Sequence, residues 1–297
     1  MSSEQPILEV TGVVVTFGAV VAVNHVSVAV PRGVVCGLIG PNGSGKTTFL
    51  GAISRFVPAT GGRIAFDGAD ITKSPPYKVS AAGMSRTFQA MHLLDRMTVR
   101  ENVMAGVDFR LAPRTLVRSW LDVRHALKSQ RAAAKLADQA LERVGMSGYG
   151  DASPAELPYG MQRRVEIARA LAVGPKLLLL DEPVAGMNDE ERREISQLVQ
   201  DLRREGLTQI LVEHDLATIH RVCDMAYVLN FGEVIAHGTP AEVVGLPAVR
   251  EAYLGHASLA DSGELASPAA VSAEPALPVR DDDSSKGVNS DAATARP

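Results

Sequence analysis

Aromatic residues and cysteines are scarce in this 297-residue chain. Aromatics make up 4% of the residues while 46% are hydrophobic, so the core must be built mainly from Val, Leu, Ile and Ala. Two cysteines, Cys36 and Cys223, are too few for a disulfide framework, and both lie within apolar runs. Buried, reduced thiols in a cytosolic protein are the favoured interpretation. The length suits one large domain or two small ones.

Long hydrophobic runs are also absent. The first six residues, Met-Ser-Ser-Glu-Gln-Pro, show no positive region followed by an apolar stretch, so no signal peptide is predicted. Residues 12–30 are the most apolar, but Thr16, Asn24 and Ser27 interrupt them, and their valines favour strands over a membrane helix. We expect no direct membrane insertion, and any membrane contact must come through a partner.

An excess of positive charge is missing as well. The formal net charge is −4, which gives no electrostatic reason to bind nucleic acid, so no such partner is expected. Residues 258–297 hold seven acidic and three basic residues, and the rest of the chain is neutral. Of those 40 residues, 20 are Ala, Ser or Pro and none is aromatic. This composition predicts a disordered tail, with an ordered partner-binding arm as the alternative.

Alternating strand-like and helix-like patterns run through residues 1–257. A run of four leucines before Asp181 predicts a fully buried parallel strand. Strand–helix alternation at both ends with a helical block between them predicts an α/β fold: a parallel-sheet core with an inserted helical subdomain at about residues 90–165. The other predicted elements are antiparallel strands at 10–16 and 21–30, strands at 34–39, 209–212, 225–229 and 233–237, helices at 46–55 and 189–204, and a helical block at 99–144.

A glycine-rich loop follows the strand predicted at residues 34–39. Residues 40–47 read Gly-Pro-Asn-Gly-Ser-Gly-Lys-Thr and fit G-x-x-x-x-G-K-[ST], a loop whose N–H groups converge on phosphate oxygens at a helix N-terminus. Lys46 is predicted to reach the β- and γ-phosphates, and the Thr47 hydroxyl to bind Mg²⁺. A glycine-rich turn without a ligand is the alternative. The candidate nucleotide-binding residues here are Asn42, Gly43, Ser44, Gly45, Lys46, Thr47 and Thr48.

Two carboxylates, Asp181 and Glu182, follow the four leucines directly. In open α/β sheets the ligand lies at the carboxyl ends of the strands. Asp181 is therefore a candidate Mg²⁺ ligand beside Thr47, and Glu182 a candidate for polarising the water that attacks the γ-phosphate. Capping of a following helix is the alternative role for this pair.

Residues 157–171 read Leu-Pro-Tyr-Gly-Met-Gln-Arg-Arg-Val-Glu-Ile-Ala-Arg-Ala-Leu and resemble the signature motif and following helix of ATP-binding cassette (ABC) ATPases. The motif stands just before the four-leucine strand, as that family requires, and the resemblance covers residues 7–257. It implies the P-loop ABC-cassette fold with a small antiparallel β subdomain. Matching positions elsewhere are Phe17 (adenine stacking), Gln89 (Q-loop), Asn188 (D-loop) and His214 (switch histidine).

Four short stretches narrow the resemblance to the branched-chain amino acid uptake subfamily. They are Arg-Thr-Phe-Gln at 86–89, Asp-Glu-Pro-Val-Ala-Gly-Met-Asn at 181–188, Val-Glu-His-Asp at 212–215 and Ala-Tyr-Leu-Gly at 252–255. Urea-uptake ATPases are close relatives. The lipopolysaccharide-export ATPase shares the last stretch, but we expect a different sequence around its Q-loop glutamine.

The resemblance implies a mechanism. Two cassettes, identical or different, dimerise head to tail and trap two Mg²⁺·ATP between the phosphate loop of one and the signature of the other, here Tyr159 and Gly160. Gln89 links Mg²⁺ and the attacking water to the helical block, where transmembrane permease subunits dock. His214 bonds the γ-phosphate. Without the resemblance, Gln89 and His214 would each be an ordinary polar residue at a strand end.

The signature departs from the family at two positions. Pro158 and Met161 replace the usual serine and glutamine of Leu-Ser-Gly-Gly-Gln, and the subfamily usually has Leu-Ala-Tyr-Gly-Gln. Proline is tolerated in the first turn of a helix, where its missing N–H costs least. A hydroxyl that could bond a partner's γ-phosphate is nevertheless absent, which predicts lower activity at that site.

The function implied is the ATP-hydrolysing subunit of an importer of branched-chain amino acids, working with permeases and, indirectly, a solute-binding protein. It would lie in the cytoplasm, peripheral to the inner face of the membrane. Besides urea uptake and lipopolysaccharide export, two alternatives are a soluble ABC ATPase acting on ribosomes or DNA and a dimerisation switch with little hydrolysis. The first commonly has two cassettes or coiled-coil insertions, which this chain lacks. Retention of Glu182 and His214 argues against the second.

Overall fold

The computed structural model describes residues 5–88, 93–107 and 123–253, with the backbone alone for residues 123–129. Contacts within the chain group it into two units, Met1–Ala257 and Ser258–Pro297. The second unit is the predicted tail and lies outside the described residues, so its disorder stays a prediction. The account below concerns the first unit.

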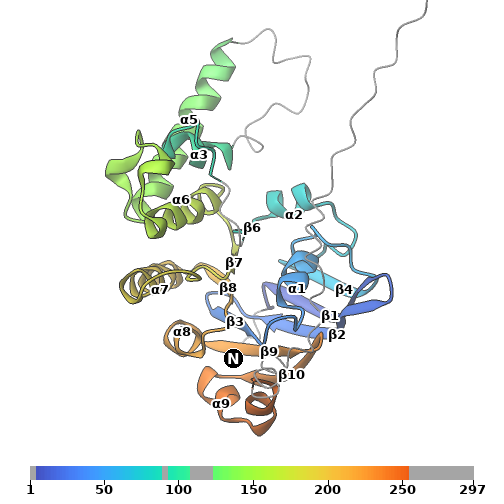
Figure 1. Ribbon diagram of the computed structural model, residues 1–297. Helices are drawn as coiled ribbons and strands as arrows, with labels where there is room; N and C mark the ends of the chain where they lie inside the picture. The colour runs from blue at the N-terminus through green and yellow to red at the C-terminus, as the bar shows by residue number, and fades with distance from the viewer. Residues whose placement is uncertain (1–4, 89–92, 108–122, 254–297) are drawn as a thin grey trace, which may run out of the picture. The chain divides into compact units, whose positions relative to one another are not determined.

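A six-stranded sheet forms the centre of this unit, in the order β10-β9-β3-β8-β7-β6 (Figure 1). All neighbouring pairs are parallel except β10 with β9. The predicted parallel-sheet core is therefore confirmed, and it gains a short edge strand, β6, that the sequence pattern did not predict. The strands are β3 (Val35–Ile39), β6 (Met84–Arg86), β7 (Leu177–Asp181), β8 (Thr208–Val212), β9 (Met225–Asn230) and β10 (Glu233–Gly238).

A second, antiparallel sheet has the order β2-β1-β4-β5. Its first two strands pair from Leu8 with Val30 to Phe17 with Val20, as the two valine-rich runs predict. Strand β4 begins with Gly-Gly-Arg, which has a low propensity for strands. Pairing with β1 stabilises it as a strand. The strands are β1 (Leu8–Phe17), β2 (Val20–Val30), β4 (Gly61–Phe66) and β5 (Ala69–Asp70).

Helices cover both faces of the six-stranded sheet. Figure 1 shows α7 and α8 on one side of it and α1 on the other. Reciprocal capping boxes begin α3, α7 and α9, which explains where these helices start. No described helix is long and apolar enough to cross a bilayer. The helices are α1 (Lys46–Ile53), α2 (Pro76–Ala82), α3 (Val99–Ala105), α5 (Val123–Arg143), α6 (Tyr159–Leu171), α7 (Asp189–Arg204), α8 (Leu216–Val222) and α9 (Pro240–Gly245).

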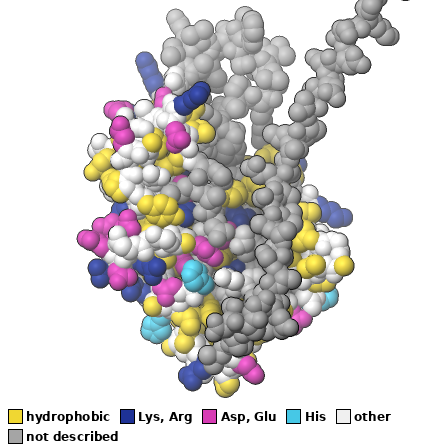
Figure 2. Space-filling model, viewed as in Figure 1, with side chains coloured by type: hydrophobic (Ala, Val, Ile, Leu, Met, Phe, Trp, Pro, Cys, Tyr) yellow, Lys and Arg dark blue, Asp and Glu magenta, His cyan; other side chains and the backbone are white. Residues whose placement is uncertain are grey.

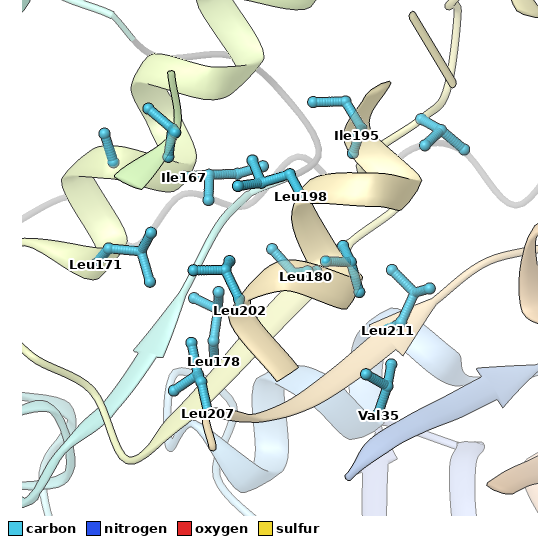
Figure 3. Close-up of a cluster of buried hydrophobic side chains, with 14 of the residues drawn as sticks. Val35, Ile167, Leu171, Leu178, Leu180, Ile195, Leu198, Leu202, Leu207 and Leu211 are labelled. Carbon is cyan, nitrogen blue, oxygen red and sulfur yellow. The ribbon is translucent and has the colours of Figure 1, made fainter. Parts of the chain in front are cut away.

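The four leucines of β7 are fully buried and alternate between two hydrophobic clusters. Leu178 and Leu180 face the side of α6 and α7, where Figure 3 shows them among Ile167, Leu198 and other apolar side chains. Leu177 and Leu179 face the side of α1. Each fully buried leucine contributes about 1.5–3 kcal/mol, so this strand holds both layers and fixes the position of Asp181 at its end.

Candidate functional site

The phosphate loop connects β3 to α1, as predicted. Gly40, Gly43 and Gly45 have φ angles of 152°, 77° and 98°. A Cβ at Gly40 would lie 2.1 Å from the carbonyl oxygen of Leu229, and one at Gly45 would lie 2.4 Å from that of Ala22. Only glycine fits these two positions, because both the backbone conformation and the space exclude a side chain.

Lys46 is buried at the start of α1. Its Nζ donates to the carbonyl oxygens of Gly40 and Pro41, both at 2.8 Å. An ammonium has three N–H donors, so one remains to reach a phosphate oxygen. Burial lowers the pKa of this ammonium, while three carboxylates act to raise it. Those carboxylates, in decreasing order of effect, belong to Glu182, Asp181 and Glu213.

The other loop residues present polar groups where an anion would bind. The Ser44 Oγ is buried and has no hydrogen-bond partner, which fits an atom that donates to a phosphate oxygen. Asn42, Gly43 and Thr47 are exposed, and Thr48 is half-buried. Thr47 is the second residue of α1, and its contact with Mg²⁺ stays a prediction.

Asp181 and Glu182 stand at the carboxyl end of β7, two strands from the phosphate loop in the sheet. Asp181 is buried; its Oδ2 pairs with Arg86 Nη2 at 2.9 Å, and its Oδ1 has no hydrogen-bond partner. The capping alternative for this pair is wrong, because the next helix, α7, begins at Asp189 and is capped by Asn188. Glu182 has a φ of 45°, a left-handed conformation that is uncommon outside glycine and is often found at functional sites.

Among the described residues, no cluster of three or more His, Cys, Asp or Glu could hold a metal by itself. The donors present nevertheless fit Mg²⁺ bound together with a nucleotide. Mg²⁺ is commonly bound by one or two carboxylates together with the phosphates of the nucleotide and water. The unpartnered Asp181 Oδ1 and the exposed Thr47 hydroxyl match that pattern. When bound, the ion would neutralise charge on the β- and γ-phosphates.

The remaining predicted site residues lie on loops and strand ends. His214 is exposed between β8 and α8, and Phe17 ends β1 with 53% of its surface exposed. Exposure leaves both side chains able to contact a nucleotide, but their predicted roles stay predictions. Gln89 lies outside the described residues.

The signature residues open helix α6. Tyr159 is the first helical residue and is 40% exposed. Pro158 is the N-cap of α6, which agrees with the expected helix start at this position, and it provides no side-chain cap. The Gly160 N–H donates to Glu191 Oε1 at 3.3 Å, and Glu191 Oε2 accepts from the Asn188 N–H at 3.1 Å. One carboxylate thus ties the signature to the start of α7.

Glu213 is a site carboxylate that the sequence pattern did not single out. It is fully buried, and its Oε1 accepts from the Val184 N–H at 3.3 Å, in the loop that follows Glu182. Burial raises the pKa of Glu213 to about 7, the Val184 N–H lowers it, and the Glu182 charge raises it further. Its place between Val212 and the predicted switch residue His214 was the one available signal.

Glu213→Gln is expected to stabilise the nucleotide-free chain at pH 8. A carboxyl whose pKa is higher in the folded than in the unfolded chain contributes to the stability of the fold. That contribution is fully present below the unfolded pKa and is lost as pH rises through the folded pKa. From the ordinary value of 4.5 to about 7, the loss is on the order of 3 kcal/mol. The free energy of unfolding of wild type, measured in urea, should therefore fall between pH 4.5 and 8 relative to that of the variant. Glu9→Gln, at an exposed strand position, is the control; parallel pH profiles for wild type and Glu213→Gln would contradict the prediction.

Two family models match the chain. A model described as ABC transporter matches residues 23–185. A second, described as branched-chain amino acid ATP-binding cassette transporter, matches residues 233–258.

Curated relatives match over most of their length. The high-affinity branched-chain amino acid transport ATP-binding protein BraF of Pseudomonas aeruginosa is 38% identical over 254 residues, which are 85% of this chain and 99% of that protein. LivG of Escherichia coli K12, with the same description, is 37% identical over the same shares. The lipopolysaccharide export system ATP-binding protein LptB of Haemophilus influenzae is 36% identical over 78% of this chain and 90% of that protein.

Solved structures show the same fold. A nucleotide-free ATP-binding cassette from an ABC transporter superposes with a TM-score of 0.74 at 33% identity, over 84% of this chain and 99% of that one. The ADP conformation of the cassette MJ1267 gives a TM-score of 0.74 at 33% identity, over 85% of this chain and all of that one.

Proposed function

The chain belongs to the ABC transporter family of ATP-binding subunits, and from that membership we propose that it drives the import of branched-chain amino acids by hydrolysing ATP. The match of residues 233–258 to the branched-chain amino acid family and the names of BraF and LivG support this substrate class. The resemblance read from the sequence is thereby confirmed at the level of the family.

One observation carries the catalytic part of the proposal. The loop that carries the buried Lys46 and the acidic pair follow the parallel strands β3 and β7 at the same edge of the sheet, and the charges of Glu182 and Asp181 act to raise the pKa of the Lys46 ammonium. Lys46 and the loop N–H groups would hold the phosphates, Thr47 and Asp181 would hold Mg²⁺, and Glu182 would orient and deprotonate the attacking water. Gln89 and His214 complete the set, with Phe17 against adenine.

A groove of about 630 Å³ suits the permease contact. Its lining includes Phe56, Tyr77 and Phe88, together with residues of α6 such as Arg169. Phe56 and Tyr77 are 56% and 64% exposed, more than large apolar side chains usually are. Phe88 directly precedes Gln89, the residue expected to sense the permease. We therefore propose that a short apolar segment of the permease binds in this groove. The cassette would then lie against the inner face of the membrane, and it would work as a pair with a second cassette.

Deletion of the gene in its own organism tests the substrate class. Uptake of radiolabelled leucine, isoleucine and valine should fall and should be restored by the wild-type chain but not by Glu182→Gln. Urea uptake and outer-membrane lipopolysaccharide should be unaffected. The 36% identity to LptB makes lipopolysaccharide export the second candidate. A lipopolysaccharide defect with normal amino-acid uptake would favour that candidate.

Pro158→Ser is expected to raise ATPase activity modestly in a complex with a different cassette. A charge-assisted hydrogen bond to phosphate contributes about 1.5–3 kcal/mol, so its absence slows the site holding the partner's ATP by roughly 10- to 150-fold, less what backbone N–H groups recover. Stability should change little, because a serine N-cap adds about 0.5–2 kcal/mol while loss of proline costs about 0.4–1 kcal/mol.

The measurement is the steady-state ATPase rate of the reconstituted complex. Pro75→Ser is a matched control, because Pro75 is the N-cap of α2 with a similar backbone conformation (φ −71°, ψ 154°, against −54° and 153° at Pro158). An unchanged or lower rate for Pro158→Ser, with folding intact, would mean that the site does not lack this hydroxyl.

A further inference from the structure

Arg86 ends strand β6, next to β7 in the sheet, and its side chain is 8% exposed. Its guanidinium makes polar contacts on two sides. Nη2 pairs with Asp181 Oδ2 at 2.9 Å, and Nη1 donates to Ser54 Oγ at 3.3 Å. Ser54 in turn donates to the Leu50 carbonyl of α1 at 2.6 Å. The arginine thus joins the carboxylate at the end of β7 to the helix that carries the phosphate loop.

An aromatic ring fixes the guanidinium from a third side. The Cζ of Arg86 lies 5.3 Å from the centroid of the Phe88 ring, within cation–π range. Phe88 also packs edge-on against Phe56, with centroids 5.4 Å apart. The Phe88 carbonyl accepts from Arg163 Nη1 at 3.1 Å, which holds this segment to α6. The position of Arg86 is therefore set by three elements of the fold.

The pairing leaves the two oxygens of Asp181 unequal. Oδ2 is bound to the arginine, whereas Oδ1 is buried and has no hydrogen-bond partner. Buried polar atoms of folded proteins are nearly always satisfied, so an unpartnered carboxylate oxygen at the same sheet edge as the phosphate loop indicates a ligand. A carboxylate held at one oxygen presents the other in a fixed direction, as outer-shell partners do for metal ligands.

We propose that Arg86 is a positioning residue for the magnesium site: by holding Asp181 Oδ2, it orients Oδ1 toward the ion that accompanies the nucleotide. The inference rests on the proposed Mg²⁺·ATP site. Arginine suits the role better than lysine, because its planar fork contacts Asp181 and Ser54 together while its face stacks on Phe88.

Nucleotide binding at graded Mg²⁺ concentrations tests the proposal without relying on hydrolysis. The full chain would be titrated with a fluorescent N-methylanthraniloyl derivative of ADP, in EDTA and then at increasing Mg²⁺. In Arg86→Gln, half-saturation by Mg²⁺ should shift about 10- to 100-fold upward, as for lost outer-shell partners. Arg86→Lys should shift less, and metal-free affinity should stay near wild type. Arg63→Gln is the control, because Arg63 also pairs with an aspartate but lies 64% exposed on β4.

Each other outcome has a defined meaning. Overlapping Mg²⁺ curves for Arg86→Gln and wild type, or tighter Mg²⁺ binding in the variant, would overturn the proposal. An equal loss of affinity in EDTA and in Mg²⁺ would also overturn it, by showing a merely structural role. If Arg86→Gln fails to fold, the Arg86→Lys curve decides in the same way. Failure of the wild-type chain to bind nucleotide would instead contradict the proposed function.

Discussion

Lys46→Ala is expected to weaken nucleotide binding by about 10- to 150-fold. The ammonium is buried and can direct one remaining N–H to the phosphates beyond its two loop carbonyls. A charge-assisted hydrogen bond from that N–H contributes about 1.5–3 kcal/mol. At about 1.4 kcal/mol per tenfold change, that loss spans one to two decades of the dissociation constant.

Calorimetric titration with Mg²⁺·ATP measures this loss directly. Lys73→Ala, at an exposed position before α2, is the matched control and should bind as wild type does. Thermal melts of the empty proteins separate binding from folding, because Lys46→Ala also removes the Lys46 donor from the carbonyls of Gly40 and Pro41, of which Pro41 keeps the Ser44 N–H. A folded Lys46→Ala variant with a near-normal dissociation constant would remove Lys46 from the phosphate site.

The parts of the site that the sequence predicted share one property: each is fixed locally. The phosphate loop depends on glycines at set spacing, and the short run Leu177–Leu180 is typical of an inner strand of a sheet. Asp181 and Glu182 follow that strand directly, so their place at the sheet edge comes with it. Helix α7 was predicted to its observed bounds, and the structure shows that a capping box of Asn188 and Glu191 fixes its start locally.

The parts that were missed depend on partners distant in sequence. Arg86 and Asp181 are 95 residues apart, and Arg163 meets the Phe88 carbonyl across 75 residues. A lone charged residue is most often solvated, so no local pattern marks Arg86, Arg163 or Glu213 as buried. The short strands β4 and β6 were missed for the same reason, since pairing with β1 and β7 stabilises them and their own composition does not.

Glu182→Gln should give the largest loss of turnover while leaving ATP bound. The amide keeps the size and hydrogen-bonding reach of the carboxylate but cannot take a proton from water. The backbone should tolerate the change, because Gln can adopt the left-handed conformation of Glu182 (φ 45°) as readily as Glu, and the N–H bond to the Val212 carbonyl at 3.0 Å does not involve the side chain. Removal of a general base typically costs about 10²- to 10⁴-fold in rate.

The expected result therefore combines opposite outcomes in two measurements. Single-turnover hydrolysis should fall by that factor, whereas the ATP dissociation constant should stay within about threefold of wild type, because the lysine and loop contacts that dominate binding are unchanged. Loss of one negative charge beside the phosphates can even tighten binding, which would favour an ATP-bound dimer detectable by size-exclusion chromatography.

Glu142→Gln, at an exposed position on α5, should change neither quantity. Undiminished hydrolysis by Glu182→Gln would exclude Glu182 as the base, and the search would move to His214 or to Glu213, the buried carboxyl whose pKa of about 7 suits proton transfer near neutral pH.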